Sequence, residues 1–159
     1  MSEPRVRAYL PLTTEGLAEL ERSGLCGPAP LRVHTVTEAV REALPDSDDE
    51  ELEYAALTAA AQHSVELPSD RPRRVLVALD VGAVEDLGDP EDPTAALVSH
   101  EVPRRRVAAA HVDTEEAEEA VEAARAARGT PAYDELLERC LDHELAWFAT
   151  QEIAGLLDP

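Results

Sequence analysis

Short β-prone runs alternate along this chain with sequences that start helices, and this alternation limits the fold more than any other feature. The dipeptide Arg-Val opens four such runs, at residues 5–6, 32–33, 74–75 and 106–107. Three of them lead into threonine and acidic residues, at 13–15, 37–38 and 113–116. Side-chain oxygens of these types cap free helix N–H groups, and acids suit the positive end of the helix dipole. The pattern therefore predicts an α/β protein.

The same patterns give approximate boundaries. We expect strands at about 5–11, 31–36, 73–80, 95–102 and 105–112, and helices at about 14–23, 37–44, 48–66, 114–127 and 131–156. Only Pro103 and Arg104 separate the last two strands, which indicates an antiparallel hairpin. Elsewhere strand and helix alternate, as in βα units. The expected fold is one α/β domain over residues 1–159, with a mixed sheet of about five strands and helices packed on it.

Two segments of this expected domain stand out. Residues 86–94 (DLGDPEDPT) are acidic and contain proline and glycine, which predicts a mobile loop. Residues 131–156 carry two apolar rows at helical spacing, Leu137-Leu141-Leu145-Phe148 and Leu136-Cys140-His143-Trp147. A stripe this wide predicts a last helix that is buried on a broad face and acts as the spine of the fold.

The charge balance excludes several classes of function. The 159 residues include 34 Asp and Glu against 14 Arg and no lysine, a net charge of −20. Such a surface repels phosphate backbones and anionic membranes, so we expect no direct nucleic-acid or membrane binding. Without lysine there is neither a P-loop nor a Schiff-base lysine. Three interpretations of the acidity stay open: solubility, a basic partner, or adaptation to high salt.

Cysteine usage and the start of the chain indicate a compartment. The two cysteines, Cys26 and Cys140, form no C-x-x-C pattern and are better interpreted as small buried hydrophobes than as a disulfide framework. The first residues lack the basic and apolar regions of a signal peptide, and no apolar run approaches transmembrane length. We therefore expect a cytoplasmic protein.

A ligand or metal site is predicted at the carboxyl ends of the strands. Asp80 and Asp113 each follow an apolar run, and this edge is where α/β sheets bind ligands. Carboxylates there suit a divalent cation, and His111 and His143 could add imidazole nitrogens. His143-Glu144 resembles half of a zinc motif, but Trp147 stands where the second histidine is needed. The alternative is structural: Asp113 caps the next helix, Asp80 starts a turn, and the histidines, His63 included, lie in the core.

Trp147 is the candidate anchor for a partner. It adjoins Phe148 in a chain with only 3% aromatic residues, and tryptophan is enriched among the residues that dominate binding interfaces. The alternative is that both rings pack in the core.

The chain also resembles a family of small uncharacterised actinobacterial proteins, filed as a domain of unknown function. The segments that carry the resemblance run from residue 5 to residue 157, nearly the whole length: RVRAYLPLTTEGLAEL, GPAPLRVHTVTEAVREAL, DEELEYAALTAAA, RRVLVALDV and DHELAWFATQEIAGLL. Its most specific parts are residues 51–56 and 142–152. The resemblance implies a bacterial cytoplasmic source and carries no activity, cofactor or residue role.

Taken together, the sequence favours a non-enzymatic protein that acts through protein interaction. The first alternative is a small metal-dependent enzyme or ligand-binding domain using Asp80, His111, Asp113 and His143. The second is a DNA mimic, which requires acidic side chains in regular rows on an elongated face. No cofactor and no oligomeric state follows from the sequence.

Overall fold

A large antiparallel sheet organises the structure, a computed structural model that describes residues 5–157. The described residues form a seven-stranded sheet of order β5-β6-β3-β1-β4-β8-β9. Its strands are β1 (Val6–Leu12), β3 (Leu31–Thr35), β4 (Val75–Val81), β5 (Glu85–Asp86), β6 (Ala95–Val98), β8 (Val107–Val112) and β9 (Ala146–Ala149). A small separate sheet pairs β2 (Leu25–Cys26) with β7 (Val102–Pro103).

The strand pairing corrects the expected mixed sheet. Every strand pair within residues 5–157 is antiparallel, with β1 between β3 and β4. About five strands was also too few. The sequence analysis missed the edge strands β5 and β9, which have two and four residues, and the short strands β2 and β7. Runs this short show no usable alternation.

The expected hairpin between residues 95–102 and 105–112 is wrong as well. β6 pairs with β3 and β5, whereas β8 pairs with β4 and β9. Between them the chain leaves the large sheet and forms β7, in which Val102 pairs with Cys26. Both side chains are buried in the main core. Burial of Val102 against β2 therefore separates the two runs.

The first three helices begin within one residue of the expected positions. The six helices of the described chain are α1 (Thr14–Ser23), α2 (Glu38–Ala43), α3 (Asp49–Glu66), α4 (Glu118–Ala126), α5 (Tyr133–Arg139) and α6 (Ile153–Leu156). Thr13, Thr37 and Asp48 each accept a hydrogen bond from a backbone N–H of the first turn, at 3.0, 3.2 and 2.9 Å. The fourth helix starts later than expected, because residues 115–117 form a 3-10 turn.

The last expected helix, 131–156, is wrong. Helix α5 ends at Arg139, and a 3-10 turn, the strand β9 and the short helix α6 follow it. His143 has extended backbone angles (φ −112°, ψ 121°), so the chain leaves the helical conformation there. The pairing of β9 with β8 provides hydrogen-bond partners for the backbone groups on the side of β8 that faces away from β4. The free energy of this long-range pairing outweighs the helical propensity of the segment.

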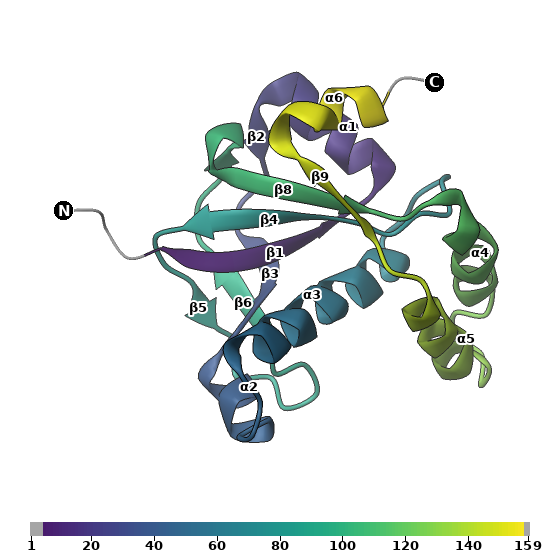
Figure 1. Cartoon of the computed structure of the whole chain (residues 1–159), viewed down its shortest axis with the longest axis horizontal. Helices are drawn as coiled ribbons and strands as arrows, with labels where there is room; N and C mark the ends of the chain where they lie inside the picture. The colour runs from purple at the N-terminus through teal and green to yellow at the C-terminus, as the bar shows by residue number, and fades with distance from the viewer. Residues whose placement is uncertain (1–4, 158–159) are drawn as a thin grey trace.

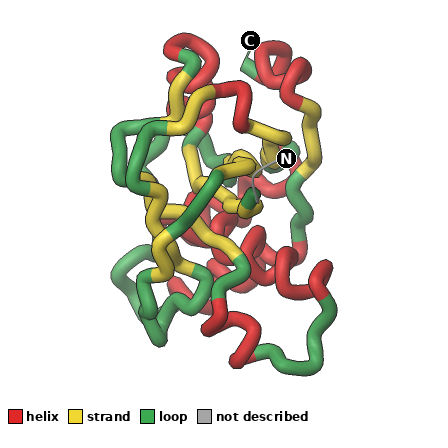
Figure 2. Tube along the Cα trace, turned by 90° about the vertical axis from the view of Figure 1, so that its left-hand side faces the viewer, coloured by secondary structure: helices red, strands yellow, loops and turns green. Residues whose placement is uncertain are grey.

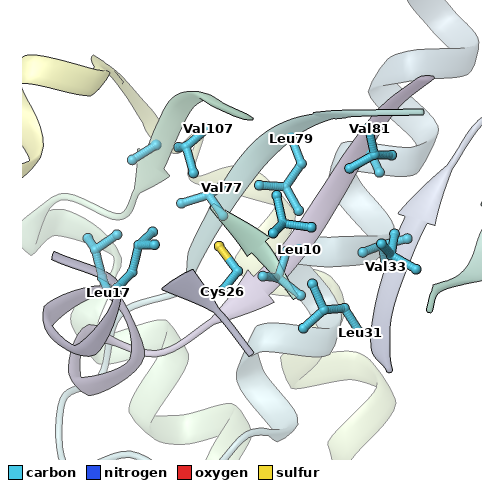
Figure 3. Packing of buried hydrophobic residues seen from close by; sticks show 14 of the residues in the cluster. Leu10, Leu17, Cys26, Leu31, Val33, Val77, Leu79, Val81 and Val107 are labelled. Carbon is cyan, nitrogen blue, oxygen red and sulfur yellow. The ribbon is translucent and has the colours of Figure 1, made fainter. Parts of the chain in front are cut away.

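Helices cover both faces of the sheet (Figures 1 and 2). On one face α1 and α6 pack with the β2–β7 sheet over the main core, where Leu17 and Cys26 face Leu10 and Val77 (Figure 3). On the other face α3 lies against the sheet through buried Ala56, Ala60 and Ala61. Small side chains at these positions allow the helix to approach the strands closely.

The position of α3 leaves one end of the sheet open on its face. The helix packs against β3, β1 and β4, and β8 and β9 lie beyond it (Figure 1). Helices α4 and α5 pack on each other at the C-terminal end of α3. Within residues 5–157 no helix combines the length and the apolarity needed to cross a membrane.

Candidate functional site

A groove lies between α3 and the residues that lead into β9. It encloses about 140 Å³. Its lining comes from α3, the start of β4, β8 and the segment before β9: Tyr54, Leu57, Thr58, Ala61, Arg74, His111, Leu141, His143, Glu144 and Leu145. Because Tyr54, Ala61 and three leucines form the apolar half of this lining, we call this feature the aromatic groove. It forms where α3 no longer covers the sheet.

Two of the sequence candidates, His111 and Trp147, lie side by side here. They are direct partners across the β8–β9 pair, so their side chains share one face of the sheet. The His111 ring also contacts Tyr9 edge-on, with centroids 6.4 Å apart. Burial lowers the pKa of His111, and the charge of Arg7 lowers it further. His111 is therefore neutral at pH 7 and can exchange a hydrogen bond without carrying charge.

Trp147 is on the surface rather than in the core. Its side chain is 60% exposed, and Tyr54 and Leu141 beside the groove are 57% and 40% exposed. Phe148 points to the opposite face and packs against the main core. The two rings that adjoin in sequence thus separate, as neighbours on a strand do. The structural alternative holds for Phe148, and Trp147 is available to a partner.

Asp113 lies beneath the groove in a buried ion pair. Its Oδ2 accepts hydrogen bonds from the backbone N–H and from Nε of Arg74, both at 2.8 Å, and its Oδ1 accepts one from Nη2 at 2.8 Å. Arg74 also donates to the backbone carbonyl of His143 at 2.7 Å. Asp113 is therefore not the helix cap that the sequence suggested: it anchors Arg74, which holds the segment before β9.

The four predicted ligand or metal residues do not gather into one cluster. His111 and His143 both line the groove, and Asp113 reaches it only through Arg74. Asp80 lies within β4 and pairs with Arg7, Nε to Oδ1, at 2.9 Å. No group of three or more His, Cys, Asp or Glu suited to a metal ion is present among residues 5–157. The metal-site hypothesis is left without a ligand set in the described chain.

The sequence analysis missed three residues that shape the groove, namely Tyr54, Arg74 and Leu141. In the sequence, Tyr54 falls within an expected helix and Arg74 opens a β-prone run, and neither stands out as a site residue. Leu141 falls in an apolar row that predicts a buried helix face. Tyr54 offered a clue to the groove, because it is an aromatic residue among the acidic residues at the start of α3. The apolar residues that α3 buries lie on the side of the helix that faces the sheet. His63 lies on a different face of α3 and lines a second pocket.

These features define an acidic α/β protein with an antiparallel sheet and an exposed aromatic groove beside an edge strand. Residues 6–157 match the description "Family of unknown function (DUF6912)", so the chain belongs to this family. No curated protein and no solved structure matches the chain. The match confirms that the chain belongs to a family of unknown function; it does not show the actinobacterial origin that the resemblance implied, and it supplies no activity.

Proposed function

We propose that this protein acts by binding another protein, through the aromatic groove and the adjoining edge strand β9. The observation that carries the proposal is the exposure of two of the few aromatic side chains at this place: Tyr54 lines the groove, and Trp147 lies opposite the groove residue His111 across the β8–β9 pair. Exposed aromatic surface beside a groove is typical of interaction sites. We propose the cytoplasm as the location of this interaction, as the cysteine usage suggests, and a bacterial source, as the family resemblance implies.

The edge position of β9 suggests how a partner binds. Within the described chain β9 pairs with β8 alone, since it ends the strand order of the sheet. Its sequence, Ala146–Ala149, contains neither the proline nor the charged residue that commonly protects an edge. An extended peptide could therefore add a strand to β9 and place side chains over Trp147 and in the groove.

Charge selects the kind of peptide. The chain has a net charge of −20, Glu144 lines the groove, and the neighbouring Asp142 is exposed. An extended segment containing arginine or lysine complements this field, and its cations can stack on the faces of Trp147 and Tyr54. We therefore propose a short cationic β-prone segment of another protein as the occupant.

The alternatives from the sequence have less in their favour. Asp80 and Asp113 each face an arginine, so neither of the two predicted strand-end carboxylates is free to support the metal-dependent alternative. A DNA mimic requires ordered rows of carboxylates, whereas among residues 5–157 Glu144 is the one carboxylate that lines the groove.

Selection of displayed random peptides on the immobilised protein tests the proposal. Enriched peptides should contain Arg or Lys within β-prone residues. In calorimetric titrations, Trp147→Ala and Tyr54→Ala should each weaken binding at least about tenfold, as expected of central interface residues. Leu44→Ala is the matched control, because Leu44 is 41% exposed and lies at the end of α2. Enrichment of acidic peptides, or equal binding by wild type and both aromatic variants, would refute the proposal.

A further inference from the structure

A second pocket lies on another face of α3, and its lining is polar. It encloses about 410 Å³ between α3, β3, α5 and the acidic loop at 87–94. Its polar lining includes Arg32, His34, Gln62, His63, Glu66 and Asp92. This volume is within the range of small-molecule sites. The pocket is separate from the aromatic groove, because it uses different residues of α3.

A chain of hydrogen bonds runs from the acidic loop into this pocket. The Thr94 hydroxyl donates to Oδ1 of Asp92 at 3.1 Å. Oγ1 of Thr94 is also 2.8 Å from Nδ1 of His34, and Nε2 of His34 is 2.9 Å from Nδ1 of His63. The two rings are perpendicular, with centroids 5.1 Å apart. Four side chains are thus linked in series, from Asp92 to His63.

The direction of the first hydrogen bond, from Thr94 to Asp92, fixes which atom donates in each of the others. Since Thr94 gives its one hydroxyl proton to Asp92, its oxygen must accept from Nδ1–H of His34. A neutral His34 then has a bare Nε2, which accepts from Nδ1–H of His63. A neutral His63 in turn carries no proton on Nε2. The chain therefore directs a lone pair outward at Nε2 of His63.

The surroundings keep both rings neutral. His34 is buried, and burial lowers its pKa to about 4, with the charges of His63 and Arg32 acting in the same direction and Asp92 opposing them. Burial is also the main cause of the lowered pKa of His63. No hydrogen bond within residues 5–157 engages Nε2 of His63. This atom is a neutral hydrogen-bond acceptor that lines the pocket.

We propose that this pocket binds a small organic cation, an ammonium or guanidinium compound, whose N–H donates to Nε2 of His63. Histidine 63 is the hydrogen-bond acceptor of the site, and His34, Thr94 and Asp92 are the positioning residues that hold its Nε2 unprotonated. The ligand keeps its protons, and the neutral Nε2 of His63 accepts a hydrogen bond from it.

The charges that face His63 support this class of ligand. Its own helix contributes Glu66, the acidic loop contributes Asp89, Glu91 and Asp92, and β3 contributes Arg32 and His34. Arg32 is engaged by Asp92 and Asp89, at 3.2 and 4.0 Å. Four carboxylates against one engaged guanidinium give the pocket a negative potential. A cationic ligand is therefore attracted to the pocket.

Nitrogen-15 NMR of the histidine side chains, recorded on the full protein at neutral pH, tests the direction of the hydrogen bonds from Asp92 to His63. Nε2 of His63 and Nε2 of His34 should both give the shifts of unprotonated nitrogens. Titration with ethanolamine and with methylguanidine should move the His63 Nε2 signal, and acetate should leave it unchanged. A protonated Nε2 on His63 would overturn the proposal. So would a response to acetate, or no response to either cation.

Variants of Thr94 distinguish an effect of the hydrogen-bond chain on His63 from an effect of packing. Thr94→Val keeps the shape and removes the hydroxyl, so it should move the proton of His63 to Nε2 and weaken cation binding at least about tenfold. Thr94→Ser should restore both. His100→Gln is the matched histidine control, because His100 is exposed and does not line the pocket. Melting curves should first show that Thr94→Val and wild type are both folded. Equal cation binding by the two proteins would then mean that the histidine pair serves packing alone, and it would refute the site.

Discussion

At the scale of single residues, the pair Arg74–Asp113 shows where a sequence pattern stops being informative. Asp113 follows a β-prone run and precedes a helix, which suggested a cap or a ligand. The structure instead buries it against Arg74, with both side chains almost fully covered. The pairing depends on the register of β4 beside β8, a contact between residues 39 positions apart. Local spacing carries no information about such a partner.

Loss of Asp113 should therefore destabilise the fold strongly. Asp113→Ala leaves the Arg74 guanidinium buried without its counter-charge, and breaking a buried pair in this way costs about 3–5 kcal/mol. Urea denaturation of the variant measures this loss. Asp80→Ala is the comparison, because the Asp80–Arg7 pair is partly exposed and such pairs contribute only about 0–1 kcal/mol. Equal losses for the two variants would contradict the buried pair.

The buried His34 should make stability fall in acid. Its pKa drops from 6.5 to about 4 in the folded protein, so between these values the unfolded chain binds a proton that the folded chain refuses. Stability therefore decreases as pH falls from 6.5 toward 4, and it is independent of this group above 6.5. The slope from one such group is at most about 1.4 kcal/mol per pH unit.

His34→Gln removes this titration while it retains a hydrogen-bonding side chain. Denaturation curves for wild type and variant, collected across the same pH range, isolate the contribution of His34, because both proteins contain the same carboxylates. The wild-type free energy of unfolding should fall more steeply in acid than that of the variant. Parallel curves would show that His34 does not titrate differently in the folded and unfolded chains.

At the scale of elements, the helix starts were predictable and the C-terminal segment was not. Thr13, Thr37 and Asp48 act on backbone groups within one turn, so their chemistry is visible in a short window. The segment 140–149 has apolar residues at helical spacing, but four of its residues pair with β8 instead. The edge of a distant strand decides its conformation, and no local pattern reports that edge.

This difference reverses which apolar residues matter near the C-terminus. Leu141 belongs to an exposed 3-10 turn, so Leu141→Ala should change stability by less than about 1 kcal/mol. Ile153 begins α6 and is fully buried in the main core, so Ile153→Ala should cost about 2–5 kcal/mol. Thermal or urea unfolding of the two variants compares them directly. A larger loss of stability for Leu141→Ala than for Ile153→Ala would contradict the observed fold of this segment and favour the single long helix that the sequence suggested.

At the scale of the whole molecule, composition and alternation were enough for the α/β class, and topology was not. The expected hairpin rested on closeness in sequence, whereas the observed order brings β4 between β1 and β8. The candidate sites follow from that order. Trp147 could be proposed as an anchor from its rarity, but the groove beside it exists only because α3 stops at β4. The His34–His63 contact likewise joins a strand to a helix 29 positions away.

The net charge is also a property of the whole molecule, and it predicts the response to salt. Of the 14 arginines, eight form ion pairs within residues 5–157. The excess of 34 carboxylates still gives −20 and repels itself in the compact state. Salt screens this repulsion, because the Debye length falls from about 30 Å at 0.01 M to about 3 Å at 1 M. Exposed ion pairs are screened too, but each contributes little.

Stability should therefore rise with ionic strength. We expect the melting temperature to increase by several degrees between low and high sodium chloride, where about 1 kcal/mol corresponds to about 2–4 °C for a chain of this size. At low ionic strength, different sodium salts should give the same increase, since screening depends on charge and concentration alone. Calorimetric scans measure both effects. A melting temperature that falls with salt would contradict this prediction. It would mean that attraction within the arginine–carboxylate pairs stabilises the fold more than repulsion among the unpaired carboxylates destabilises it.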